Sequence, residues 1–168
     1  MYFFFLKQHI NTIMYYLQKK AKYSQTVTSY NTVDCWFMVW IDNIEKQWRQ
    51  SECDMRCISP DHDVGLCIRG YKLFANIPWD RVDKVIIPIN INDKFHWFLV
   101  VFQNKHSCLY VYDSMMGEFI HSRKVKEVVD KLVTMIPLFL TSTGFYGKRL
   151  DLYANNLPDY NRSLTLNL

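Results

Sequence analysis

The sequence predicts a single α+β domain with a central antiparallel sheet flanked by helices, and three observations indicate this fold class. Two segments in the N-terminal part repeat apolar residues every three to four positions, which is typical of helices with one buried side. Short runs of β-branched and aromatic residues then follow in close succession, as in adjacent antiparallel strands. With 168 residues, 49% of them hydrophobic, the chain can bury the core of one domain.

The first predicted helix spans Phe3–Lys22. This segment contains neither glycine nor proline, and its apolar residues recur at helical spacing, at Leu6, Ile10, Ile13, Met14 and Leu17. A polar stretch from Ser24 to Thr32 follows. We therefore treat residues 1–29 as an N-terminal helical segment in front of the main domain, residues 30–168.

A second helix is predicted over Val33–Trp48, where the apolar repeat includes three tryptophans. Asn31 or Thr32 is the expected N-cap, because amide and hydroxyl oxygens accept hydrogen bonds from the first free backbone N–H groups of a helix. Residues 51–79 have weak periodicity and contain prolines and glycines. We expect loops and a short helix there.

The central sheet is predicted from three runs, Val85–Ile91, Trp97–Phe102 and Cys108–Tyr112. Polar turns at 92–94 and 103–105 separate them, which is the pattern of an antiparallel meander. A last helix is predicted over Val125–Ile136, ending before Pro137 because proline lacks the backbone N–H that a helix interior requires. The final thirty residues read as irregular.

Composition excludes several classes of function. The net charge of +4 comes from 20 basic and 16 acidic residues without a run of five like charges, so we predict no nucleic-acid partner. The longest apolar runs are far shorter than the roughly 20 residues that span a bilayer, so we predict no membrane segment. We see no export signal, and the five cysteines therefore read as reduced thiols of a nuclear or cytoplasmic protein. No cofactor is predicted, and the oligomeric state is left open.

One histidine and one aspartate lie at strand ends in the predicted sheet. His96 begins one strand and Asp113 follows the end of the next, so antiparallel pairing places them at the same edge. A carboxylate there could hold one ring nitrogen of His96 and leave the other to accept a proton from a nucleophile. On spacing alone, however, residues of these types at strand ends more commonly cap turns or face water.

The stretch around these residues resembles a known family. His96-Trp97 after a Pro-Ile-Asn strand, followed by Tyr110-Val111-Tyr112-Asp113-Ser114, is similar to the ubiquitin-like proteases, the cysteine peptidases that process SUMO and related modifiers. The similarity extends over Tyr30–Arg149. The sequence also resembles divergent plant members of the family. It implies a papain-like fold and a ubiquitin-like modifier, or its conjugate, as partner.

The resemblance also implies residue roles. His96 corresponds to the general base and Asp113 to the residue that orients it, while a cysteine thiolate attacks the carbonyl after the modifier's terminal Gly-Gly. Trp97 corresponds to the residue that covers the narrow tunnel through which the glycines pass. An ordinary buried aromatic is an equally good interpretation of Trp97.

The sequence departs from the family in three places. The family's oxyanion-hole glutamine and its Asp-Cys-Gly nucleophile motif follow the aspartate, but this chain has no glutamine after Gln103 and no cysteine after Cys108. The family's Trp-Leu-Asn-Asp motif is replaced by Tyr30-Asn31-Thr32-Val33-Asp34. We therefore predict a partial domain with its C-terminal part missing, and an inactive chain. The alternative is a non-catalytic module that binds a ubiquitin-like protein.

Two other interpretations involve cysteine. Cys35-Trp36 resembles the Cys-Trp pair of papain, where a helix N-terminus lowers the thiol pKa, although the flanking glutamine, glycine and serine are missing. Cys53, Cys57, His62 and Cys67 resemble the ligands of a zinc knuckle, a single-stranded nucleic-acid module. The first gap in that series is one residue too long and most of the knuckle glycines are absent, so scattered thiols are favoured and no metal site is predicted.

Overall fold

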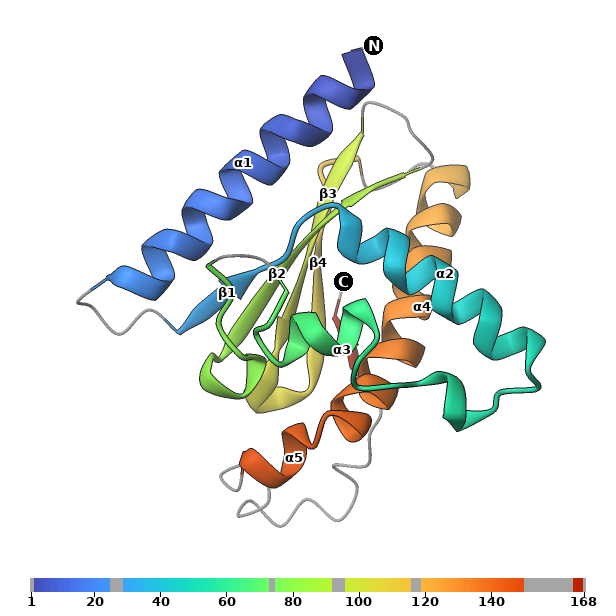
Figure 1. Ribbon diagram of the computed structural model, residues 1–168. Coiled ribbons are helices and arrows are strands. Elements are labelled where there is room, and N and C mark those ends of the chain that lie inside the picture. The colour runs from blue at the N-terminus through green and yellow to red at the C-terminus, as the bar shows by residue number, and fades with distance from the viewer. Residues whose placement is uncertain are drawn as a thin grey trace.

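The computed structural model describes residues 2–24, 29–72, 75–91, 96–115, 119–149 and 165–167. It confirms the α+β class, with one sheet and helices packed around it (Figure 1). The helices are α1 (Tyr2–Tyr23), α2 (Trp36–Gln50), α3 (Asp63–Ile68), α4 (Phe119–Ser142) and α5 (Phe145–Lys148). The strands are β1 (Tyr30–Thr32), β2 (Lys84–Asn90), β3 (Trp97–Gln103), β4 (Cys108–Tyr112) and β5 (Thr165–Asn167). Three 3₁₀ turns, η1 (Met55–Cys57), η2 (Trp79–Arg81) and η3 (Asn104–His106), complete the elements.

The centre of the sheet is the predicted meander, but its two edges are different. β2, β3 and β4 pair antiparallel, with Ile87 opposite Val100 and Val100 opposite Val111. β1 pairs parallel with β2, and β5 pairs parallel with β4. The sheet is therefore mixed, with the order β1-β2-β3-β4-β5. Both added strands have three residues, too few for an alternating pattern to show.

The predicted cap of the second helix is wrong. Asn31 and Thr32 lie in β1, and α2 begins only at Trp36, whose backbone N–H donates to the Asp34 carboxylate over 2.9 Å. The polar side chains of β1 are used elsewhere, because Asn31 Nδ2 donates to the Ile77 carbonyl over 2.7 Å. A buried amide gains more from such a partner than from a solvent-exposed helix end.

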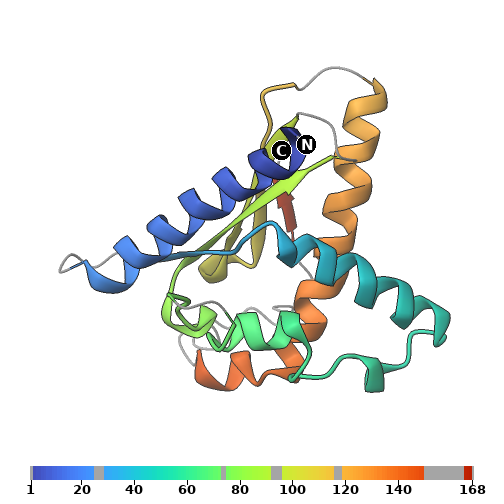
Figure 2. The same ribbon diagram turned by 45° about the horizontal axis from the view of Figure 1, so that its top comes forward.

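α1 is attached to β1 and to the start of α2 by hydrogen bonds. Thr32 Oγ1 donates to the Met14 carbonyl over 2.8 Å, and Gln18 donates to the Thr32 carbonyl. Asn11 Oδ1 accepts from the Cys35 backbone N–H at 2.9 Å. The helix lies along the β1 side of the sheet, as Figures 1 and 2 show. The division between residues 29 and 30 stays a prediction.

The last predicted helix does not stop at Pro137. α4 continues to Ser142 with Pro137 inside it, although proline cannot donate the bond that would reach back to the carbonyl of Val133. Beyond the proline, Phe139 and Leu140 are completely buried. Burial of side chains of this size is worth about 2 kcal/mol each, which offsets a local cost of about 3 kcal/mol for the proline.

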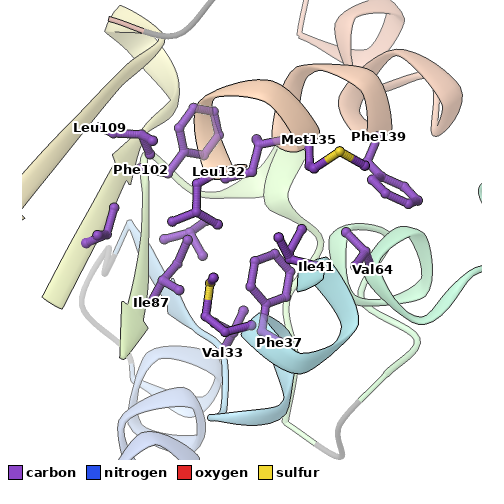
Figure 3. Packing of buried hydrophobic residues seen from close by; sticks show 14 of the residues in the cluster. Val33, Phe37, Ile41, Val64, Ile87, Phe102, Leu109, Leu132, Met135 and Phe139 are labelled. Atoms are coloured by element: carbon purple, nitrogen blue, oxygen red, sulfur yellow. The ribbon is translucent and has the colours of Figure 1, made fainter. Parts of the chain in front are cut away.

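The core lies between the sheet and the helices α2, α3 and α4, where Figure 3 shows Ile87, Phe37 and Leu132 facing one another. Trp79 in η2 is completely buried. Its ring lies 5.7 Å from that of Phe37 and 5.8 Å from that of Phe102, between centroids. Side chains from α2 and from β3 thus both pack against the indole ring of Trp79.

Residues 51–79 contain the predicted loops and one short helix, α3. The predicted turn at 92–94 and most of the C-terminal stretch, residues 150–164, lie outside the described residues. In the described part of the chain, no helix combines the length and apolar character needed to cross a membrane.

Candidate active site

His96 and Asp113 meet at one edge of the sheet. The register pairs Leu99 with Tyr112, which places the residue after β4 beside the beginning of β3. His96 Nε2 lies 2.7 Å from Asp113 Oδ1, a hydrogen-bonding distance, as expected for two residues at the same edge of the sheet. The contact is largely shielded from water, because the side chain of His96 is 15% exposed and that of Asp113 only 2%.

Backbone contacts hold both residues in place. Asp113 Oδ1 also accepts the Met115 backbone N–H at 2.9 Å, which fixes the carboxylate in the turn after β4. Asn90 at the end of β2 donates from Nδ2 to the His96 carbonyl over 2.8 Å. The asparagine of the Pro-Ile-Asn strand therefore anchors the histidine backbone, a role that the sequence alone did not reveal.

This geometry selects one tautomer of the His96 ring. An ionised carboxylate only accepts hydrogen bonds, so the proton lies on Nε2 and Nδ1 is the basic nitrogen. Asp113 also stabilises the imidazolium that would form if Nδ1 took a proton. The pair is thus arranged as a general base with its orienting carboxylate. The catalytic roles of both residues stay predictions.

Trp97 lines a pocket next to this pair. The pocket has a volume of about 280 Å³ and lies where β2 ends and β3 begins, and Cys35 before α2 and Asp42 in α2 also line it. Lys7 of α1 and Lys131 of α4 also line it, and Lys131 Nζ contacts Asp42 Oδ1 at 2.5 Å. The sequence pattern does not reveal that these charged residues share a pocket, because they lie far apart along the chain. The Nε1 atom of Trp97 is buried and has no hydrogen-bond partner in the described part of the chain.

Cys35 lies at the N-terminus of a helix, as the papain comparison requires, but its surroundings disfavour the thiolate form. It occupies the N-cap position of α2 and lines the Trp97 pocket. Burial, with a further contribution from the Asp34 carboxylate, raises the pKa of the Cys35 thiol to about 12. The thiolate needed for nucleophilic attack is therefore disfavoured at neutral pH, despite the helix N-terminus.

Three of the other cysteines, Cys57, Cys67 and Cys108, are not arranged as nucleophiles either. Cys67 is completely buried, and burial raises its pKa. Cys108 lies at the far end of β4 from Asp113, and its Sγ donates to the His106 carbonyl over 3.1 Å. Cys57 Sγ donates to Ser51 Oγ over 3.2 Å.

The zinc-knuckle interpretation finds no support in the geometry. Within the described ranges, no three histidine, cysteine, aspartate or glutamate side chains are grouped so as to hold a metal ion. His62 instead caps α3, since its Nδ1 accepts the Val64 backbone N–H at 3.2 Å.

Because His62 is a titratable cap, we expect the free energy of unfolding to depend on pH. Burial lowers the pKa of His62 from its usual value of 6.5, so the unfolded chain binds the proton more readily than the folded one. The neutral His62 cap therefore stabilises the folded state fully above pH 6.5. This stabilisation is lost as the pH falls through 6.5 towards the pKa of His62 in the folded state. In chemical denaturation between about pH 7.5 and 5.5, His62→Asn should show a shallower loss of unfolding free energy, because asparagine caps without titrating.

The control for this experiment is His9→Gln, on the exposed side of α1. This variant should keep the wild-type pH dependence. Equal slopes for His62→Asn and the wild type would contradict the assignment to His62.

Comparisons with known proteins agree with the sequence resemblance. The profile of the Ulp1 protease family, C-terminal catalytic domain, matches residues 4–152. Among solved structures, the SUMO protease Ulp1 with its catalytic cysteine oxidised to a sulfonic acid is 16% identical, with a TM-score of 0.47. The alignment covers 94% of this chain and 53% of that one.

A second similar structure is the C-terminal Ulp1 protease domain in complex with Smt3, the yeast orthologue of SUMO. It is 13% identical with a TM-score of 0.44, and the alignment covers 94% of this chain and 54% of that one. The chain thus spans about half the length of the solved structures that it matches. No curated protein matches it. Because the family profile matches most of its length, the chain belongs to the Ulp1 protease family, in the C-terminal catalytic domain.

Proposed function

We propose that His96 and Asp113 supply the general base and its orienting carboxylate for a cysteine peptidase that processes SUMO or a related ubiquitin-like modifier. The observation that carries the proposal is the shielded 2.7 Å contact between His96 Nε2 and Asp113 Oδ1 in a chain of this family. In the proposed reaction, Nδ1 of His96 takes the proton of a cysteine thiol and later returns it to the leaving amine. Asp113 keeps the ring oriented throughout.

We further propose that the 168-residue chain alone does not cleave its substrate. Cys35 shares the pocket with Trp97, but its raised pKa of about 12 leaves little thiolate for His96 to pair with. Cys67 is buried, and Cys108 lies at the other end of its strand. The base and its orienting group therefore have no activated nucleophile among these cysteines.

A cleavage assay tests the inactivity. The purified chain, incubated with a SUMO precursor that carries a C-terminal extension, should release no more product than its His96→Ala variant does. Cleavage that disappears in His96→Ala would confirm the base and refute the inactivity. Cleavage that disappears in Cys35→Ser would identify Cys35 as the nucleophile.

The Trp97 pocket supports a binding role that does not require a nucleophile. The pocket volume of about 280 Å³ and the Trp97 ring in its wall suit an extended peptide end without bulky side chains. We therefore propose that the modifier's Gly-Gly terminus binds beside Trp97. This makes the non-catalytic binding module the second candidate function.

Calorimetry with processed SUMO tests the binding. Trp97→Ala should weaken binding by about tenfold or more, since central interface tryptophans typically contribute over 1 kcal/mol. Removal of the two terminal glycines from SUMO should have the same effect. The matched control is Trp36→Ala, whose side chain is 56% exposed on α2. If neither Trp97→Ala nor removal of the two glycines weakened binding, the modifier would bind at another surface.

We also propose that the protein acts in the nucleus or cytoplasm. All five cysteines are free thiols in the structure, which is typical of reducing compartments.

A further inference from the structure

A second pocket lies at the opposite end of the sheet from His96. Its volume is about 340 Å³, and Asp80 and Arg81 of η2 line it just before β2 begins. The other walls come from Arg69 and Tyr71 after α3, and from Thr143 and Lys148 around α5. Three segments, residues 69–71, 78–81 and 143–148, therefore meet in this pocket, and none belongs to the proposed active site.

Arg69 forms one side of the pocket and is held there by its neighbours. Its Nη2 contacts Asp61 Oδ1 at 2.7 Å, and its guanidinium carbon lies 5.3 Å from the centroid of the Tyr71 ring. Its Nε is buried and has no hydrogen-bond partner in the described part of the chain. Because this atom is buried, Arg69 contributes its positive charge to the pocket and not its Nε donor.

Two further cations in the pocket lack a carboxylate partner. Arg81 and Lys148 are both exposed, and within the described residues neither forms an ion pair. Among the described residues that line the pocket, Asp80 is the one carboxylate, and Arg69 is also paired with Asp61 outside the lining. The pocket therefore has an excess of positive charge.

The walls are held by the backbone and by the core. Gly70 has a φ of 82°, and a Cβ there would lie 2.8 Å from Pro78, so the segment that carries Arg69 packs directly against the start of η2. Trp79, between Pro78 and Asp80, is completely buried. Arg69 and Arg81 are thus positioned by packing that does not depend on a ligand.

We propose that this pocket binds a phosphate group, a function that goes beyond the proposed peptidase site. A phosphate dianion offers several acceptor oxygens to arginine donors and a charge that two unpaired cations can balance. Attraction by the cations and repulsion by Asp80 both grow with the charge of the anion, and the cations outnumber Asp80 in the wall. A phosphate with two charges therefore gains more than an acetate with one. The group can belong to a phosphorylated protein or to a small polyphosphate.

Calorimetric titration of the 168-residue chain with inorganic phosphate, at constant ionic strength, tests this proposal. We expect saturable binding to one site and weaker binding of acetate. Arg81→Gln combined with Lys148→Gln should raise the Kd by about tenfold or more, because charge-assisted hydrogen bonds are roughly twice as strong as neutral ones. Both side chains are exposed, so the variant should fold normally.

The matched control, Lys19→Gln combined with Lys46→Gln, removes the same charge from exposed positions of α1 and α2. It should leave the Kd unchanged. Asp80→Asn should tighten phosphate binding, an effect that mere loss of structure would not produce.

A phosphoserine peptide and pyrophosphate distinguish the two sources of the group, and tighter binding of either one supports the proposal. Equal loss of binding in the control and pocket variants would overturn it, because the interaction would then be general charge attraction. The absence of saturable phosphate binding, or acetate binding as tight as phosphate, would also overturn it. None of these results depends on whether the chain processes SUMO.

Discussion

Replacing Trp79 with alanine is expected to lower the free energy of unfolding by about 3–5 kcal/mol, the range typical of a buried tryptophan. Trp79 is completely buried and packs against Phe37 of α2 and Phe102 of β3. Its removal leaves a cavity between helix and sheet that neighbouring side chains can only partly fill. Urea denaturation followed by far-UV circular dichroism measures the effect.

Trp36 is the matched control for this substitution. It is 56% exposed on α2, so Trp36→Ala removes the same side chain without opening a cavity and should cost less than about 1 kcal/mol. Equal losses for the two variants would mean that Trp79 does not organise the core. Because Phe102 belongs to the strand that His96 precedes, Trp79→Ala should also weaken any property of the site that depends on the position of β3.

Replacing Gly65 with alanine is expected to cost about 3 kcal/mol, the upper part of the range for overpacking. A Cβ at this position in α3 would clash with the Pro60 carbonyl oxygen, a backbone atom that cannot move like a flexible side chain. Either α3 or the Pro60 loop must shift, and α3 carries the buried Val64 and Cys67. The same denaturation measurement applies.

Gly147 provides the comparison within the same chain. It lies in α5, and a Cβ there meets nothing within 4 Å. Gly147→Ala should therefore be neutral or stabilising by up to about 1 kcal/mol, because alanine is the better helix former. A loss in Gly147→Ala as large as that in Gly65→Ala would show that the clash with Pro60 is not the cause.

The central strands could be predicted because their signal is local. Alternating β-branched and aromatic residues in three neighbouring runs specify strands, and short turns between them require antiparallel pairing. The proximity of His96 and Asp113 follows from that pairing, and the structure confirms it at 2.7 Å. Their catalytic roles, the part of Trp97 in binding, and a plant origin stay predictions.

Other features depend on partners far away in the sequence. Asn31 and Thr32 read as a helix cap, but tertiary hydrogen bonds place them in a parallel edge strand. Pro137 reads as a helix end, but burial of the residues that follow it extends α4. In each case a local preference of a few kcal/mol is outweighed by contacts that no local pattern reveals.

The sequence by itself determined the α+β class, the antiparallel centre of the sheet, and the meeting of a histidine with an aspartate at its edge, since these follow from periodicity and chain order. Only the tertiary structure decided that Cys35 is a partly buried thiol with a raised pKa, and that Arg69, Arg81 and Lys148 share one pocket. The physical reason is that burial and charge depend on everything that surrounds a side chain. Those surroundings come mostly from distant parts of the chain.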